Sequence, residues 1–293
     1  MRIALLFNHG AGRGTSLGAL RETLARAGHE VVRVIDGKDD AHRLAEPPAE
    51  LAVAAGGDGT VAAAAQALAG THVPLAVLPI GTANNVAFTL GVAGSDERIA
   101  AGWHTARPRP FDLGLLRGDW GNRRFIEGVG GGLVEACMRA IAQRPVPDDE
   151  PPPWQMVRAL RRYTEALARL EPRPWDFSVD GNRRTGDFLL VEVLNGRAVG
   201  PNLELAPDAS PFDGRLAVVT ARAEDREVLA AYLADLLGGR ESRLQLPVEP
   251  ATQVEIVTPH PLHVDDALLD ASRTGTVSIE IEPGALTVLT PAT

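Results

Sequence analysis

Cysteine is almost absent from this 293-residue sequence. The one cysteine, Cys137, cannot form a disulfide within the chain. Because disulfides persist mainly in oxidising compartments, we expect a cytoplasmic protein. No segment approaches the roughly 18 consecutive apolar residues that a membrane-spanning helix needs, so membrane contact would have to be peripheral. The apolar run within residues 1–10 is too short for a signal peptide and is typical of a β-strand.

Lysine is equally scarce, and basic charge is not in excess. Lys38 is the only lysine and lies in the turn-like segment 36–40, so we expect neither a Schiff-base enzyme nor a kinase with a lysine on a buried strand. The net charge of −9 and the pI near 5.3 argue against a general nucleic-acid partner, although a local basic patch stays open. The seven histidines show no metal-ligand spacing, and His9 and His263 are interpreted as incidental.

The hydrophobic residues are ample and fall into two patterns. Their share of 45% is typical of a soluble globular protein, and the length favours two domains. Residues 1–110 alternate short apolar runs with helix-like runs, which predicts a Rossmann-like α/β domain with a parallel sheet. The expected strands are 2–7, 30–35, 51–56 and 74–80, and the expected helices are 16–28, 60–70 and one that begins near 84.

Beyond residue 110 the apolar runs become short and alternating. Turn signals such as Asp180-Gly181 and Pro283-Gly284 separate them. Residues 111–285 are therefore predicted to form a second domain, a β-rich sandwich. The segments 154–170 and 225–239 are predicted to be helices inserted into it.

Three loops in the first domain are rich in glycine and follow apolar strands: 8–14, 56–60 and 79–85. The carboxyl ends of parallel strands meet at one edge of a sheet, where ligands usually bind. Glycine lets the backbone approach a bulky anion, and N–H groups at the following helix start can point at that anion. Together the loops predict a site for a nucleoside triphosphate.

Polar side chains in these loops have two interpretations. Thr60 and Thr82 could donate hydrogen bonds to phosphate or could cap their helices. A carboxylate beside phosphates, here Asp58, is explained by a Mg²⁺ ion or by water bound to it. The alternative for any one loop is a tight turn, because neither the spaced dinucleotide fingerprint nor a Walker motif is present.

Several blocks of sequence, taken in order, resemble the diacylglycerol kinase catalytic domain superfamily, which also holds sphingosine kinases and bacterial lipid kinases. The blocks are GGDGT at 56–60, LPIGTANNVAFTLG at 78–91, FDLG at 111–114, FIEGVGGGLVEA at 125–136 and APDASPFDGRL at 206–216. The resemblance covers nearly the whole chain. It implies that the N-terminal domain binds ATP, that the β-rich domain supplies the lipid side, and that a final strand at about 286–293 returns to the first domain.

The resemblance also implies roles for single residues. A structural Mg²⁺ would be held by the Asp213 side chain with the carbonyl groups of Ser210 and Arg215, and Asp112 would help to link the metal to the active site. The other interpretation is that Asp213 shapes a type I turn and that Asp112 ends a strand. The residues implied to contact the nucleotide are Asn8, Gly10, Gly12, Arg13, Gly14, Gly56, Gly57, Asp58, Gly59, Thr60, Thr82, Asn84 and Asn85.

The sequence departs from the family pattern near the nucleotide. Bacterial members read L-N-E after GGDGT, whereas this chain has Val61, Ala62 and Ala63. The family's GTxND ends in Asn85 here, with an amide in place of the carboxylate. These changes reduce the negative charge and could weaken Mg²⁺ binding, change the acceptor or reduce activity.

The late VDGE motif, whose glutamate is the proposed general base, is also altered. Residues 264–267 read V-D-D-A, so an alignment without a gap places Ala267 at the base position. A one-residue deletion places Asp266 there, and we adopt this alignment because a carboxylate can accept the proton if it comes within hydrogen-bond reach. The predicted catalytic residues are therefore Asp266, Asp58 and Asp265. Asp270 is a further candidate, and the late aspartates could instead be solvated turn residues.

The sequence thus predicts an ATP- and Mg²⁺-dependent lipid kinase, with diacylglycerol as the first expected acceptor and a sphingoid base or another lipid alcohol as alternatives. A lipid acceptor requires a membrane surface, and the basic amphipathic segment 154–170 is the candidate contact, unless it packs on the β-rich domain with solvated arginines. An NAD kinase relative, which would share GGDGT, is disfavoured by the 206–216 block and by GTANN at 81–85. A degenerate member that binds nucleotide or lipid without turnover stays open, as does a homodimer.

Overall fold

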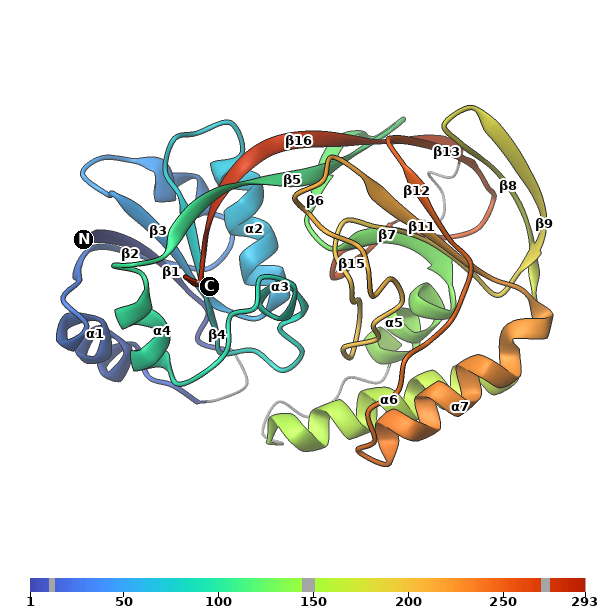
Figure 1. Ribbon diagram of the computed structural model, residues 1–293, viewed down its shortest axis with the longest axis horizontal. Coiled ribbons are helices and arrows are strands. Elements are labelled where there is room, and N and C mark those ends of the chain that lie inside the picture. The colour runs from blue at the N-terminus through green and yellow to red at the C-terminus, as the bar shows by residue number, and fades with distance from the viewer. Residues whose placement is uncertain (11–13, 144–150, 270–274, 293) are drawn as a thin grey trace. The chain divides into compact units, whose positions relative to one another are not determined.

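The computed structural model describes residues 1–10, 14–143, 151–269 and 275–292 (Figure 1). The chain divides into two compact units. The first unit joins Met1–Asp112 to Pro283–Thr293, and the second unit is Leu113–Glu282. Within the described residues no helix combines the length and the apolarity needed to cross a membrane.

A parallel sheet forms the centre of the first unit, in the order β2-β1-β3-β4 with the end of β16 beside β4. Its strands are β1 (Arg2–Phe7), β2 (Glu30–Asp36), β3 (Leu51–Gly56), β4 (Leu75–Pro79) and the last part of β16 (Thr276–Thr290). Its helices are α1 (Leu17–Arg26), α2 (Asp58–Leu68), α3 (Asn85–Thr89) and α4 (Asp96–Gly102), with the short 3₁₀ helix η1 (Ala41–Ala45).

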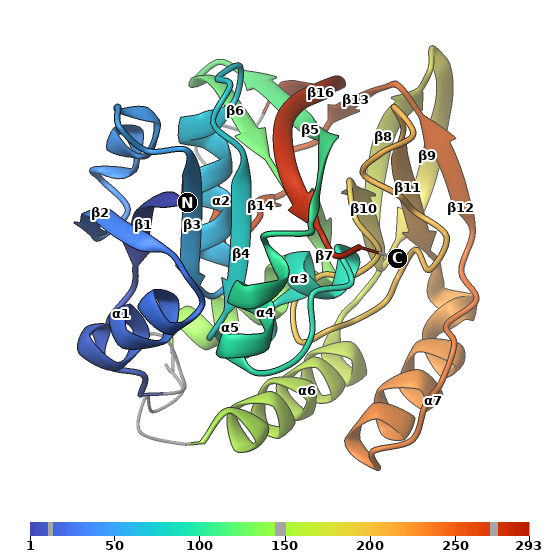
Figure 2. The same cartoon turned by 60° about the vertical axis from the view of Figure 1, so that its left-hand side comes forward.

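Helices cover both faces of this sheet. Every residue of β3 is buried, as a strand with two covered faces requires. One face packs on α1 and α4 through Leu20, Leu24 and Ile99, whereas α2 lies on the other face and is seen behind the strands in Figure 2. Helix α1 begins after Ser16, whose hydroxyl accepts the Ala19 N–H at 3.2 Å.

The second unit contains two groups of β-strands. One sheet has the order β12-β11-β10-β7-β14-β15, and the other group pairs β16 with β13, β13 with β8, β8 with β9, and β5 with β6. The strands are β5 (Arg107–Gly118), β6 (Gly121–Phe125), β7 (Gly128–Gly132), β8 (Arg173–Val179), β9 (Asn182–Phe188), β10 (Leu190–Leu194), β11 (Leu216–Ala221), β12 (Val248–Ala251), β13 (Gln253–Val257), β14 (His263–Val264) and β15 (Ala267–Leu268).

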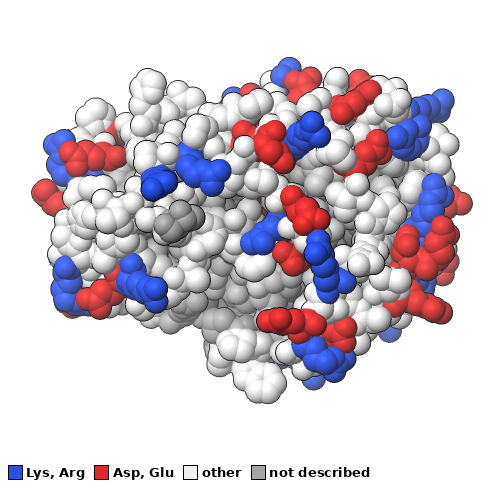
Figure 3. Space-filling model, viewed as in Figure 1, with Lys and Arg blue, Asp and Glu red and all other residues white. Residues whose placement is uncertain are grey.

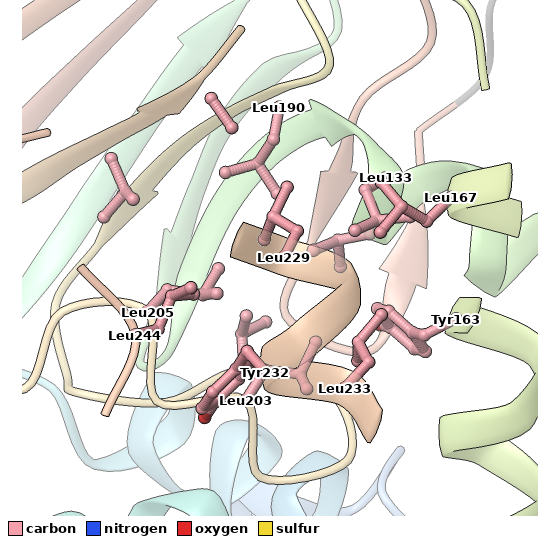
Figure 4. Close-up of a cluster of buried hydrophobic side chains, with 14 of the residues drawn as sticks. Leu133, Tyr163, Leu167, Leu190, Leu203, Leu205, Leu229, Tyr232, Leu233 and Leu244 are labelled. Carbon is pink, nitrogen blue, oxygen red and sulfur yellow. The ribbon is translucent and has the colours of Figure 1, made fainter. Parts of the chain in front are cut away.

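Alternate side chains of β10 point to opposite faces of its sheet, so they contribute to two separate hydrophobic clusters. Val191 and Val193 of β10 join the apolar cluster shared by both groups of strands, so the unit is a sandwich. Leu190 and Leu194 point to the opposite face and join a second cluster, to which the helices contribute (Figure 4). The helices are α5 (Leu133–Gln143), α6 (Pro152–Arg169) and α7 (Arg226–Leu237), preceded by the 3₁₀ helix η2 (Ala223–Asp225). The predicted fold class, a parallel α/β unit and a β-sandwich with inserted helices, is confirmed.

Two details differ from the expectation. Helix α5 was not predicted, because its sequence belongs to a motif block that begins as a strand. The predicted turn at Pro283-Gly284 is wrong, because β16 continues through it. Gly284 has a φ of +61°, and its N–H donates to Oδ1 of Asp112 at 2.8 Å, so this position carries a bend within a strand.

Candidate active site

The three glycine loops begin at the same edge of the parallel sheet. Phe7 of β1 lies opposite Ala55 of β3, and Gly56 of β3 lies opposite Pro79 of β4, so the three strands end in register. Two backbone hydrogen bonds continue this pairing into the loops. Asn8 N–H donates to the Ala55 carbonyl at 3.2 Å, and Ile80 N–H donates to the Gly56 carbonyl at 3.2 Å. The structure therefore brings the predicted nucleotide loops together.

Close packing explains why the second and third loops need glycine. A Cβ atom placed on Gly81 would lie 2.3 Å from the Cα of Gly57, and a Cβ on Gly56 would lie 2.2 Å from Oγ1 of Thr60. Atoms at such distances clash, so the backbones can approach only without side chains at these positions. Thr60 is buried inside the first turn of α2, whose N-cap is Gly57, so Thr60 does not cap this helix.

Asp58 links the starts of two helices. It is the first residue of α2, and its Oδ1 accepts the Val86 N–H of α3 at 3.1 Å. Burial raises the pKa of the Asp58 carboxyl, and hydrogen bonds from the backbone N–H groups of residues 84–86 oppose this shift. The carboxylate therefore has a structural contact in addition to any contact with a ligand.

The third loop is closed by its own asparagine. Asn84 has a left-handed φ of +57°. Its Oδ1 accepts the Gly81 N–H at 3.0 Å, and its Nδ2 donates to the Gly81 carbonyl at 2.8 Å. Only an amide can make both contacts, since a carboxylate has no donor. Asn85 is buried beside it, and Thr82 is half-buried in the same loop.

The first loop is described only in part. Oδ1 of Asn8 accepts the N–H of Gly10 at 3.0 Å, so this asparagine shapes its own turn. Gly14 has a φ of +63°, a backbone conformation that favours glycine. Gly12 and Arg13 lie outside the described residues, and Gly59 lies half-buried in the first turn of α2.

The predicted metal residues lie in two places. Ser210, Asp213 and Arg215 share one loop, where Oδ1 of Asp213 accepts the Arg215 N–H at 3.0 Å, as in the turn interpretation. Asp112 is buried and accepts the Gly284 N–H of β16. Among the described residues, no three His, Cys, Asp or Glu side chains are grouped closely enough to hold a metal ion.

The late aspartates occupy the tip of a hairpin. β14 and β15 pair so that Asp265 and Asp266 form the two-residue turn between them. Asp265 is buried with a φ of +47°, and its carboxylate accepts N–H groups of residues 126–128 at 2.9–3.3 Å. Burial raises the pKa of Asp265 to about 6, although these N–H groups oppose the shift. Asp266 is exposed and Ala267 is half-buried, whereas Asp270 lies outside the described residues.

A buried pair beside this hairpin was missed by the sequence analysis. Nε2 of His263 lies 2.9 Å from Oε2 of Glu192, and both side chains are fully buried. His263 had been interpreted as incidental. A glutamate in the middle of the apolar run FLLVEVL is the signal that could have indicated a buried partner, because a buried charge is rarely left unpaired.

A basic groove lies along α6. It has a volume of about 810 Å³, and its polar lining includes Arg158, Arg161, Arg162 and Arg169 together with Glu165. The opposite side of α6 is buried in the helical core through Leu160, Tyr163 and Leu167. Trp154 at the start of the helix is 64% exposed.

Two family models match the chain. One, described as the diacylglycerol kinase catalytic domain, matches residues 2–116, and the other, described as the YegS C-terminal NAD kinase beta sandwich-like domain, matches residues 132–290. A diacylglycerol kinase of Mycobacterium tuberculosis is 28% identical over 313 residues, which cover 99% of this chain and 95% of the relative. A protein of Pseudomonas aeruginosa named probable lipid kinase YegS-like is 30% identical over 277 residues, which cover 91% of this chain and 86% of the relative.

The fold is also similar to solved structures. The crystal structure of a diacylglycerol kinase from Bacillus anthracis strain Sterne superposes with a TM-score of 0.72 at 21% identity. The match covers 99% of this chain and 96% of that chain. At this identity the likeness concerns the fold.

Proposed function

Because the chain belongs to the diacylglycerol kinase catalytic domain family, as a kinase-type enzyme related to lipid kinases, we propose that it transfers the γ-phosphoryl group of ATP to a lipid hydroxyl group. Diacylglycerol is the first acceptor to test, since two relatives carry it in their names. The observation that carries the proposal is the convergence of three glycine loops, with Asp58 among them, at one edge of the parallel sheet.

The loops suit the phosphates of a nucleotide. The bare backbone at Gly57 opens the approach to the start of α2, where an anion is favoured. Asp58 would orient a Mg²⁺ ion, and one protein carboxylate fits this ion because it takes most of its ligands from water and phosphate. When bound, Mg²⁺ offsets negative charge on the phosphate oxygens.

Asp266 is the proposed proton acceptor for the lipid hydroxyl. Its exposure leaves the carboxylate accessible, and the β14–β15 hairpin supplies a short, fixed support. Asp265 has a different proposed role, because its carboxylate is buried and already receives backbone N–H groups. It would shape the turn and leave proton transfer to its neighbour.

The basic groove along α6 is the proposed contact with a membrane surface. Four arginines line it, and Nη1 of Arg162 is buried without a hydrogen-bond partner in the part of the chain that the structure describes. Guanidinium groups that line the groove could donate charge-assisted hydrogen bonds to lipid phosphate oxygens. Elsewhere, on the face drawn in Figure 3, basic and acidic side chains are interspersed, so the attraction would be local.

A sphingoid base or another lipid alcohol is the alternative acceptor. A member without turnover is the alternative of a different class, favoured by Val61, Ala62 and Ala63 after GGDGT and by Ala267 in the late motif. The transfer of label to lipid separates them, because a kinase labels its lipid acceptor whereas a member without turnover labels none.

The test is label transfer from γ-labelled ATP with Mg²⁺ to diacylglycerol, monoacylglycerol, sphingosine or ceramide in mixed micelles. The parent is compared with Asp58→Asn and Asp266→Ala, and Asp119→Ala is the matched control. Asp119 is also an exposed carboxylate in a two-residue hairpin turn of the second unit. Labelled lipid that is lost in the first two variants and kept in the control would support the proposal. ATP binding without transfer to any acceptor would favour the alternative without turnover.

A further inference from the structure

Glu192, Gly130 and His263 form one rung across three neighbouring strands. Glu192 of β10 lies opposite Gly130 of β7, and Gly130 lies opposite His263 of β14. Residues directly opposite on antiparallel strands point to the same face of the sheet. β10 and β14 are two strand spacings apart, about 10 Å, so the two side chains can meet only above the central residue.

The glycine in the middle makes this meeting possible. A Cβ atom on Gly130 would lie 2.4 Å from Oε2 of Glu192 and 2.3 Å from the Val191 carbonyl oxygen. No other residue could therefore occupy the centre of the rung without displacing the carboxylate. Gly130 belongs to the strand GVGGG, which is part of a block that resembles the family. The contact with Glu192 explains why this position of the strand is a glycine.

The hydrogen bonds of His263 define where its protons are. Nδ1 lies 3.2 Å from the Asp265 carbonyl oxygen, which can only accept, so Nδ1 carries a hydrogen. Nε2 lies 2.9 Å from the Glu192 carboxylate, so one proton must also lie between these two groups. Burial lowers the pKa of His263, but the Glu192 carboxylate outweighs this effect and raises it overall. The pair therefore retains its proton.

Other ionisable groups face this pair from neighbouring elements. Glu135 of α5 raises the pKa of Glu192 further, after burial as the largest cause, and is itself paired with Arg139 at 2.6 Å. Burial raises the pKa of the Tyr163 hydroxyl on α6, and Cys137, Glu192 and Glu127 raise it further. The Glu135 carboxylate therefore adds negative charge near the pair, which favours the shared proton, whereas the Tyr163 hydroxyl stays neutral.

The pair connects directly to the hairpin turn. His263 Nδ1–H holds the carbonyl of Asp265, while Asp265 N–H donates to the Gly128 carbonyl at 2.8 Å. The Asp265 carboxylate accepts the Glu127 N–H at 2.9 Å. The residue before Asp266 is thus held at its carbonyl, its amide and its side chain, in a left-handed conformation that a free chain rarely adopts.

We propose that Glu192 and His263 are positioning residues, which hold the Asp265-Asp266 turn so that the Asp266 carboxylate keeps the direction needed for proton acceptance. The pair touches neither substrate nor nucleotide and acts through the turn. This inference rests on the proposed function, in which Asp266 accepts the proton.

The kinetic test uses Glu192→Ala, Glu192→Gln and His263→Phe, each alone and in the Asp266→Ala background. A misdirected carboxylate should lower kcat about 10- to 100-fold with KM for ATP unchanged in Glu192→Ala and His263→Phe. Glu192→Gln should restore kcat to within about threefold of the parent, because its amide can donate to a neutral Nε2. In the Asp266→Ala background, His263→Phe should cause no further loss, since the two changes remove one function.

A second measurement does not depend on activity. Side-chain ¹⁵N NMR, with His263→Gln used to assign the signal, should show no titration of the His263 ring near its ordinary pKa, because the proton between Nε2 and the Glu192 carboxylate is retained. Titration near the ordinary histidine value of about 6.5 would overturn the shared proton. A full additional loss from His263→Phe in the Asp266→Ala background would overturn positioning through Asp266. If the parent phosphorylates no lipid, the proposed function fails and this inference fails with it, whereas unchanged kcat in Glu192→Ala would refute the positioning role alone.

Discussion

Replacing Gly81 by alanine should separate two of the nucleotide loops. The added Cβ would lie 2.3 Å from the Cα and 2.9 Å from the N of Gly57, and both are backbone atoms that cannot rotate away. Ordinary contact begins at 3.4 Å, so the loops must move apart by about 3.4 − 2.3 = 1.1 Å. Overpacking of this kind raises the free energy by about 1–3 kcal/mol.

That strain should appear in ATP binding. If the loops hold the phosphates in their native spacing, 1–3 kcal/mol corresponds to a rise in Kd of about 5- to 150-fold. Isothermal titration calorimetry with ATP and Mg²⁺ measures this change, and thermal unfolding shows whether the variant is folded. Gly102→Ala is the matched control, because a Cβ there meets nothing within 4 Å and its φ is not positive. A Gly81→Ala protein with the parent's Kd and unfolding midpoint would refute the argument that this contact shapes the site.

Three further perturbations test other parts of the structure. The pKa of Asp265 is about 6 in the folded protein, against an ordinary value of 3.8 in the unfolded chain. Protonated Asp265 therefore stabilises the fold at low pH, and this contribution is lost as the pH rises from 3.8 to 6. The free energy of unfolding falls by about (6 − 3.8) × 1.36 ≈ 3 kcal/mol over this window. Denaturant unfolding of the parent and Asp265→Asn should therefore diverge by up to this amount between pH 4 and 7, and parallel curves would contradict it. Replacing Arg161 and Arg162 by glutamine should weaken binding to anionic vesicles at least tenfold in a sedimentation assay, whereas Arg183→Gln, on an exposed strand, should not. Gly130→Ala should reduce kcat at least as much as Glu192→Ala, because its Cβ would displace the same carboxylate and would also clash with the Val191 carbonyl oxygen.

The sequence predicted those parts of the fold that depend on local pattern. The spacing of apolar residues, and the glycines that mark the ends of elements, predicted the strands of the first unit and helices α1, α2, α6 and α7. The resemblance to the diacylglycerol kinase superfamily is confirmed by the family models and relatives. Helix α5 was missed because it follows the glycine-rich strand 128–132 without a break. The change from strand to helix periodicity at Leu133 is therefore hard to recognise in the sequence.

Contacts between distant segments could not be predicted from periodicity. Pro283-Gly284 has the composition of a turn, but the bond from Gly284 to Asp112 keeps it within β16. His263 lacked any local partner in the sequence, since Glu192 is 71 residues away and reaches it only across a glycine. Whether Asp265 binds backbone or solvent likewise depends on residues 126–128, which lie far away along the chain. The roles assigned to the site residues stay predictions until the assays above are made.

The path of β16 determines when the parallel sheet of the first unit can finish folding during synthesis. Residues 276–280 pair with β13, and Val288 then pairs with Leu75 of β4, a strand made more than 200 residues earlier. During synthesis the α/β unit must therefore leave the ribosome with β4 as an open edge, and an open edge can pair with the wrong strand. The Asp112–Gly284 bond forms only once this late strand arrives, so the first unit made is the last to be finished.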